Sequence, residues 1–154
     1  MNFPMQIPLC LRPSLSIAAS LIMVTAATAT AQAQTRLYSP ISLTTSRQID
    51  DTLSSQDIPT GSGGFSRDYI VTLSAGDQVA IDATSDDFDT LVTLINKDGV
   101  TVGENDDGSD GSTNSLLFVR ITESGAYTVR VSAYAGGTNT GKFKLKVARL
   151  REVP

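Results

Sequence analysis

Residues 127–133 read Tyr-Thr-Val-Arg-Val-Ser-Ala, with an apolar side chain at every second position. Because side chains on a β-strand point alternately to its two faces, this spacing predicts a strand with one buried face. Residues 142–147 read Lys-Phe-Lys-Leu-Lys-Val and repeat the pattern, with lysine as the polar member. The two segments predict the last two strands of a β protein.

Shorter segments upstream follow the same period. Residues 69–73 and 79–83 alternate, and residues 91–95 are nearly all apolar, which predicts a central strand buried on both faces. Residues 96–99 end in Asp-Gly, a pair that favours a tight hairpin turn. Residues 54–67 contain Pro59 and a Gly-Ser-Gly-Gly run, and are expected to form a loop.

No segment has a convincing helical period. About seven or eight short strands, separated by turn residues at regular spacing, predict an all-β protein. The expected fold is an antiparallel β-sandwich of jelly-roll-like arrangement.

The first 33 residues have the order of a secretory signal peptide. Arg12 is the only basic side chain in the first twelve residues. An apolar run follows, and then small residues that include Ala31-Gln32-Ala33. An uncleaved N-terminal anchor is the alternative. Cys10, the only cysteine, lies before the apolar run and would be removed with the signal peptide. The mature chain is therefore expected to have no disulfide. The predicted protein is secreted, or resides in the periplasm or cell envelope.

The predicted domain boundaries follow from these segments. They are a signal peptide over 1–33, an extended lead-in over 34–46, a sandwich domain over 47–150 and a tail over 151–154. The full chain has 12 basic and 16 acidic residues, a net charge of −4. Nucleic-acid binding requires a basic surface, so this charge argues against a nucleic-acid partner. No membrane span is expected after signal cleavage.

Five segments, taken in order, resemble parts of a known family. They are Asp68-Tyr-Ile-Val-Thr-Leu-Ser-Ala-Gly-Asp77, Ser85-Asp-Asp-Phe-Asp-Thr-Leu91, Gly103-Glu-Asn-Asp-Asp107, Ser124-Gly-Ala-Tyr-Thr-Val-Arg-Val131 and Thr140-Gly-Lys-Phe-Lys-Leu145. Together they resemble the bacterial pre-peptidase C-terminal (PPC) domain, over roughly residues 47–150. The resemblance implies a non-catalytic β-sandwich of the kind attached to the C-terminal side of secreted peptidases. Some such domains are similar to collagen-binding modules that bind calcium. No peptidase precedes the domain in this sequence.

Two acidic loops form a candidate calcium site. Ca²⁺ takes about six to eight oxygen ligands, often from carboxylates and carbonyls of flexible loops. The loops supply Asp86, Asp87, Asp89, Asn105, Asp106, Asp107 and Asp110. The alternative is that these side chains stabilise turns through local hydrogen bonds to the backbone. Asp89, just before a strand, is a candidate to cap a turn from a buried position in either case.

A lysine stripe forms a second candidate site. Lys142, Lys144 and Lys146 share one face and could bind an anionic polymer such as an acidic polysaccharide, with Arg130 nearby if the last two strands pair. The alternative is an edge strand that lysines protect against aggregation. Tyr134 could stack on a sugar ring or pack over the end of the sandwich, and the absence of Trp weakens sugar binding.

The residue types argue against catalysis. The chain has no His, and the predicted mature part has no Cys, which excludes Ser-His-Asp triads and the usual zinc sites. A hydrolase that uses a pair of Asp residues is the remaining catalytic option, and it would need a deep cleft. The sequence therefore predicts a secreted, non-enzymatic binding module for an extracellular polymer or protein, stabilised by calcium if the acidic loops bind it. The alternative is a free-standing chaperone or regulator of a secreted peptidase.

Overall fold

A computed structural model describes residues 38–43, 48–108, 111–134 and 139–150. The chain splits into two compact units, residues 1–34 and 35–154, and every described residue belongs to the second unit. The predicted signal peptide, the tail, most of the lead-in and Asp110 therefore lie outside the described residues. Within the described ranges no helix occurs that could cross a membrane.

Ten strands form in the described part of the chain. Their bounds are β1 (Ile41–Ser42), β2 (Gln48–Leu53), β3 (Ile58–Pro59), β4 (Phe65–Leu73), β5 (Gln78–Thr84), β6 (Thr90–Ile95), β7 (Thr101–Asn105), β8 (Ser115–Arg120), β9 (Gly125–Ala133) and β10 (Gly141–Leu150). The count exceeds the predicted seven or eight because β1 and β3 are two-residue strands, too short to leave a period in the sequence.

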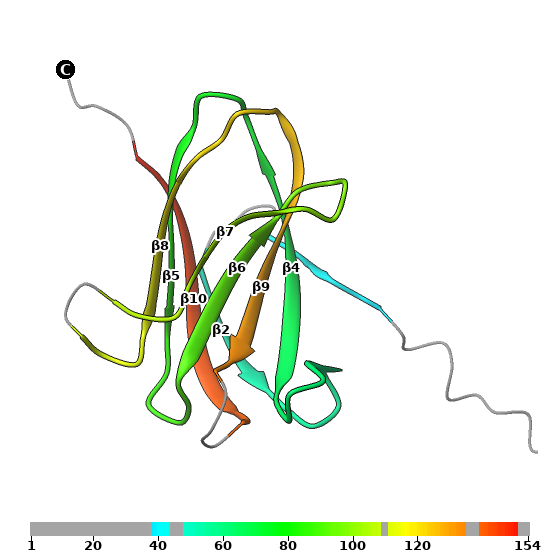
Figure 1. Cartoon of the computed structure of the whole chain (residues 1–154), viewed down its shortest axis with the longest axis vertical. Coiled ribbons are helices and arrows are strands. Elements are labelled where there is room, and N and C mark those ends of the chain that lie inside the picture. Colours follow the sequence, from blue (N-terminus) through cyan, green and yellow to red (C-terminus); the bar gives the residue numbers. More distant parts are fainter. Residues whose placement is uncertain (1–37, 44–47, 109–110, 135–138, 151–154) are drawn as a thin grey trace, which may run out of the picture. The chain divides into compact units, whose positions relative to one another are not determined.

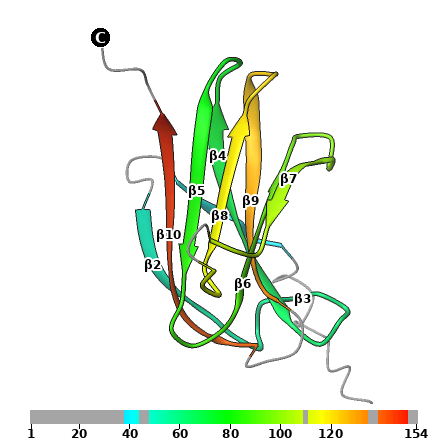
Figure 2. The same cartoon turned by 60° about the vertical axis from the view of Figure 1, so that its left-hand side comes forward.

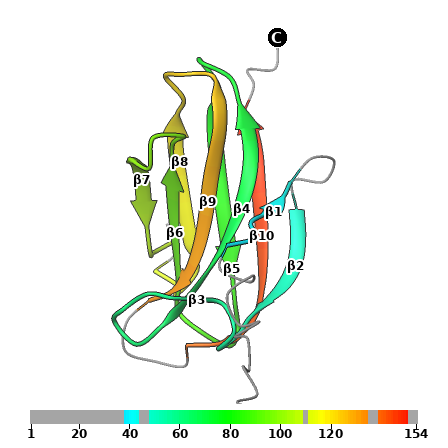
Figure 3. The same ribbon diagram turned by 90° about the vertical axis from the view of Figure 1, so that its right-hand side faces the viewer.

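The strands form two sheets that stack face to face (Figures 1 and 3). Sheet A has the order β1-β4-β9-β6-β7, with β3 also paired to β4. Sheet B has the order β2-β10-β5-β8, and Figure 2 shows its four strands side by side. All pairs are antiparallel except β1 with β4. The predicted all-β sandwich is confirmed.

The alternating segments bury the residues that their period predicts. Tyr127, Val129, Val131 and Ala133 of β9 are all buried. In β10 the apolar members of residues 142–147 are buried, and the three lysines are exposed. Such burial of large apolar side chains contributes roughly 1.5–3 kcal/mol each to folding. In the core, the Phe143 ring packs edge-on against the rings of Tyr69 and Phe88, at centroid distances of 6.3 and 6.1 Å.

The predicted hairpin at residues 96–99 forms. Gly99 has φ = 79°, and its N–H donates to the carbonyl oxygen of Asn96 at 3.1 Å. The strand before it, β6, lies inside sheet A between β9 and β7, although its end residues Leu91 and Ile95 are only half-buried. The predicted loop over 54–67 is shorter than expected, because it contains β3 and β4 begins at Phe65.

Candidate functional site

A hollow of about 530 Å³ lies at one end of sheet B. Its walls come from the end of β2, the turn between β5 and β6, and the start of β10. The lining residues are Asp50, Asp51, Thr52, Thr84, Ser85, Asp86, Asp87, Asn114, Lys142, Phe143 and Lys144. The hollow therefore joins part of one predicted acidic loop to part of the predicted lysine stripe, two sites that were distant in the sequence.

The turn at residues 85–87 is held on the start of β10 by hydrogen bonds. The Ser85 hydroxyl donates to the Lys142 carbonyl oxygen at 2.8 Å, and the backbone N–H of Lys142 donates to Asp87 Oδ2 at 2.7 Å. Asn114 Oδ1 accepts from the Ser85 N–H at 2.9 Å. Asp87 therefore fixes the wall of the hollow through a bond to a distant strand, and not through the local turn hydrogen bond that the alternative predicts. Asp86, beside it, is exposed at the hollow.

The lysine stripe lies on the outer face of sheet B. Lys144 stands opposite Asp50 of β2 and Thr84 of β5, and Lys146 stands opposite Asp82 of β5. Strand β10 has β2 on one side and β5 on the other, so it is an interior strand. The edge-protection alternative for these lysines is therefore wrong, because an interior strand has no free edge to protect.

Arg130 does not join the lysine stripe. Strands β9 and β10 do not pair, since β9 belongs to sheet A and β10 to sheet B, so the condition for placing Arg130 beside the lysines fails. Its guanidinium makes a two-point ion pair with Asp68, directly opposite on β4, at 2.7 and 2.8 Å. The Asp68 side chain is only 1% exposed. Arg130 therefore neutralises a buried carboxylate, which is a structural role.

Tyr134, at the end of β9, is 44% exposed and does not line the hollow. Its backbone N–H donates to the Asp89 carbonyl oxygen at 2.8 Å. This backbone bond holds Asp89 just before β6, and it is not the side-chain cap of a turn that the sequence suggested for this residue.

The Asp89 carboxylate lies with the second acidic loop. Burial raises the pKa of its carboxyl, and the nearby carboxylates of Asp106 and Asp107 raise it further. Asp89 Oδ1 is buried and has no hydrogen-bond partner among the described residues. Asn105 instead bonds locally, as its Nδ2 donates to the carbonyl oxygens of Asp107 and Leu116 at 2.6 and 2.8 Å. The six described members of the predicted set are thus divided between two places, and Asp110 lies outside the described residues.

No three acidic side chains in the described ranges lie close enough together to hold a metal ion. The chemistry of the Asp89 group still fits a cation, because a buried carboxylate oxygen without a donor is costly unless a positive charge or a proton reaches it. Asp89 is the residue that would bind Ca²⁺ directly, with Asp106 and Asp107 adding negative charge nearby, and carbonyl oxygens and water would complete the ligand set.

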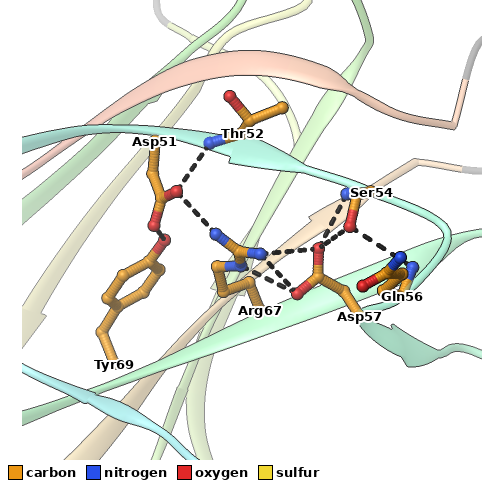
Figure 4. Close-up of polar contacts among 7 residues, drawn as sticks. All are labelled: Asp51, Thr52, Ser54, Gln56, Asp57, Arg67 and Tyr69. Atoms are coloured by element: carbon orange, nitrogen blue, oxygen red, sulfur yellow. Dashed lines mark hydrogen bonds and ion pairs between the residues drawn. The ribbon is translucent and has the colours of Figure 1, made fainter.

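A polar network behind the hollow links the two sheets (Figure 4). Arg67 of β4 donates to Asp51 of β2 at 2.5 Å and to Asp57 at 2.8 and 3.0 Å. The hydroxyl of the buried Tyr69 donates to Asp51 Oδ2 at 2.8 Å. Although burial alone would raise it, hydrogen bonds from Thr52 N–H, Tyr69 and Arg67 hold the pKa of the Asp51 carboxyl below its ordinary value. Burial and the Asp51 carboxylate raise the pKa of Tyr69, which keeps its hydroxyl a donor.

Sequence reasoning missed this network and the β2 wall of the hollow. Asp51 and Arg67 belong to different sheets, and neither is part of a local motif. Only the pairing of β2 with β10 brings Asp50 and Asp51 to the hollow. No pattern within either segment predicts that pairing.

Two stacked sheets, antiparallel except for the β1–β4 pair, with a polar hollow at one end define a small β-sandwich module. Residues 65–133 match the sequence model of the bacterial pre-peptidase C-terminal domain, so the resemblance expected from the sequence is confirmed. The match runs from β4 to β9, while β2 and β10 lie outside it. This family consists of non-catalytic modules of secreted peptidases.

Solved structures show the same fold at low identity. The chain is similar to the pre-peptidase C-terminal domain of a collagenase from Bacillus anthracis, with a TM-score of 0.56 and 11% identity, over 73% of this chain and 98% of that one. It is also similar to PliG of Aeromonas hydrophila, a periplasmic inhibitor of g-type lysozyme, with a TM-score of 0.54 and 12% identity, over 73% and 96% of the two chains. No curated protein matches the sequence.

Proposed function

We propose that this protein is a non-catalytic binding module that works outside the cytoplasm and binds a polymer in the hollow of sheet B. The observation that carries the proposal is the meeting of the acidic turn and the lysine stripe in one hollow. The predicted signal peptide and the family match support the location.

The charges in the hollow favour a ligand rich in hydroxyl groups. Asp51 and Asp87 already accept hydrogen bonds from the protein, which leaves Asp50 and Asp86 as acceptors and Lys142 and Lys144 as donors. A strongly anionic polymer would meet the carboxylates, and a cationic one would meet the lysines. A hydroxyl can donate to a carboxylate and accept from a lysine, so a neutral polysaccharide satisfies both.

Retention on insoluble polymers tests this proposal. The protein is mixed with cellulose, chitin and isolated peptidoglycan, and the bound fraction is measured against that of Asp86→Ala, Lys144→Ala and Lys97→Ala. We expect one polymer to retain the protein, with affinity lower by about tenfold in the first two variants. Lys97, on the turn between β6 and β7, does not line the hollow and serves as the control. No retention, or equal retention of all variants, contradicts the proposal.

We propose that Ca²⁺ binds the Asp89 carboxylate, beside the negative charges of Asp106 and Asp107, as a stabilising feature. The unpartnered Asp89 oxygen beside two further carboxylates supports it. Thermal melts in EDTA, in millimolar Mg²⁺ and in millimolar Ca²⁺ test it. A ligand present at a hundred times its Kd stabilises the folded state by about 2.7 kcal/mol. We expect a rise in Tm with Ca²⁺ alone that Asp89→Asn abolishes, and an equal Tm in all three buffers counts against the site.

A second candidate function is a free-standing accessory factor of a secreted peptidase. The match to a family named for its place beside peptidases favours it. The similarity in fold to PliG, a periplasmic inhibitor of g-type lysozyme matched over 96% of its chain, supports a regulatory role. Purification of the tagged protein from culture supernatant tests this function: a co-purifying peptidase supports it, and its absence contradicts it.

A further inference from the structure

An apolar patch lies on the outer face of sheet B, at the end away from the hollow. Phe118 of β8 is 62% exposed and Leu150 of β10 is 47% exposed, so other residues cover little of either side chain. A single exposed apolar residue is common, but a contiguous group with polar residues around it marks a binding surface.

The register explains why Phe118 protrudes from the sheet. Its direct neighbour across the β5–β8 ladder is Ala80, and Ala80 stands opposite Ala148 on β10. Two alanines in a row leave the ring without tall neighbours along that row. Leu116, two residues before Phe118 on the same face, extends the apolar surface. The result is a low apolar platform with one aromatic side chain above it.

Cations outnumber carboxylates on this face. Lys146 and Arg120 flank the platform, and Lys142 and Lys144 continue the same face, whereas Asp50 and Asp82 are its only carboxylates among the described strand residues. No ion pair within 4.0 Å joins any of these four cations to another described residue. The face is therefore positive, although the whole chain carries a net charge of −4.

We propose that the outer face of sheet B around Phe118 docks an acidic protein partner, which places an apolar side chain on the Ala80–Ala148 row and carboxylates against Lys146 and Arg120. An aromatic anchor with a charged rim is the usual anatomy of such interfaces. A polysaccharide fits less well, because the row of Phe118 carries only alanines on β5 and β10 and its polar side chains stand in the neighbouring rows. A second copy fits less well because two positive faces repel.

This inference goes beyond the proposed function and does not rest on it. Phe118, Arg120 and Lys146 do not line the hollow, and Asp86, which does, is not part of the platform. Loss of polymer retention in Asp86→Ala therefore reports on the hollow alone, and effects of the platform variants report on the docking surface alone.

Titration of the ¹⁵N-labelled protein with synthetic peptides tests the proposal. The probe is a twelve-residue peptide of glutamates around a central Phe-Leu pair, and the matched peptides replace glutamate with glutamine or Phe-Leu with Ser-Ser. We expect amide shift changes at residues 116–120 and 148–150 with the first peptide only. Phe118→Ser and the double variant Arg120→Glu/Lys146→Glu should each lower the affinity by about tenfold, and addition of salt should weaken binding.

Val100→Ser is the matched control, because Val100 is 59% exposed but belongs to the turn between β6 and β7. An unchanged Tm in Phe118→Ser shows that the variant is folded, as expected for an exposed side chain. The proposal is overturned if all peptides shift the same amides equally or none does. It is also overturned if Phe118→Ser removes binding of a soluble cello- or chito-oligosaccharide, or if it abolishes self-association in sedimentation experiments.

Discussion

At Gly141, the first residue of β10, the neighbouring Asp87 leaves no room for a side chain. It has φ = 152°, and a Cβ built on it would lie 2.3 Å from the Asp87 Cβ. The close approach lets the Asp87 carboxylate reach the backbone N–H of Lys142. Gly141 therefore allows the turn at residues 85–87 to pack directly against the start of β10.

We predict that Gly141→Ala lowers the free energy of unfolding by about 2 kcal/mol, because the added methyl group must displace either Asp87 or the start of β10. Chemical denaturation followed by tyrosine fluorescence measures the change. Gly125→Ala is the control, since nothing lies within 4 Å of its Cβ position. Equal losses in the two variants would show that the contact with Asp87 has no special cost.

For Asp89 we predict the opposite effect, a substitution that raises the free energy of unfolding. Its pKa is raised by folding, so the charged form is less stable in the folded state, and the penalty grows as the pH rises above the ordinary value of 3.8 through the raised one. In EDTA at pH 7, Asp89→Asn should therefore stabilise the protein by about 1 kcal/mol, with no gain at pH 3. Thermal melts at the two pH values measure this. Asp98→Asn, at an exposed turn, should change little at either pH, and a loss of stability in Asp89→Asn at pH 7 would contradict the prediction.

At the scale of the elements, Arg67 and Tyr69 attach β2 to β4 through the Asp51 carboxylate. Strand β2 pairs only with β10 among the described strands, so this network is its polar connection to sheet A. Since folding lowers the pKa of Asp51, its contribution to stability is present above the ordinary carboxyl pKa and is lost as the pH falls through the lowered one.

We predict that Tyr69→Phe costs about 1.5–3 kcal/mol at pH 7, the range for a hydrogen bond to a charged group, and less as acid protonates Asp51. Tyr127→Phe is a matched control, because the Tyr127 hydroxyl donates to the Glu123 carbonyl oxygen at 2.7 Å, an acceptor that does not titrate. Denaturation curves from pH 7 to pH 2 should show the Tyr69→Phe deficit shrinking while that of Tyr127→Phe stays constant. Parallel curves would refute the electrostatic coupling.

The elements also show how far the sequence predicts this molecule. The period-two pattern identified β9 and β10 and the faces they bury, because burial on one face determines local alternation. The pattern contains no information on which strand becomes a neighbour. Arg130 was therefore associated with the lysines of the next strand, whereas β9 and β10 joined different sheets. The hollow depends on the same non-local pairing, so only its acidic turn and its lysines could be named beforehand.

At the scale of the whole molecule, the last described strand completes sheet B. Strand β10 lies between β2 and β5 and supplies the buried side chains of Phe143, Leu145 and Val147. We predict that a chain ending at Asn139 does not fold, whereas a chain ending at Leu150, which keeps every described strand, melts cooperatively. Circular dichroism and thermal melts compare the two, and a cooperative transition in the shorter chain would contradict the role assigned to β10.

The interior position of β10 also has a consequence for how the protein is made. A ribosome adds about 5–20 residues per second, so β2 emerges several seconds before β10, its only ladder partner among the described strands. During that interval sheet B lacks the strand that joins β2 to β5. For a chain exported in extended form, as the predicted signal peptide implies, the last described strand would set the moment at which sheet B can form.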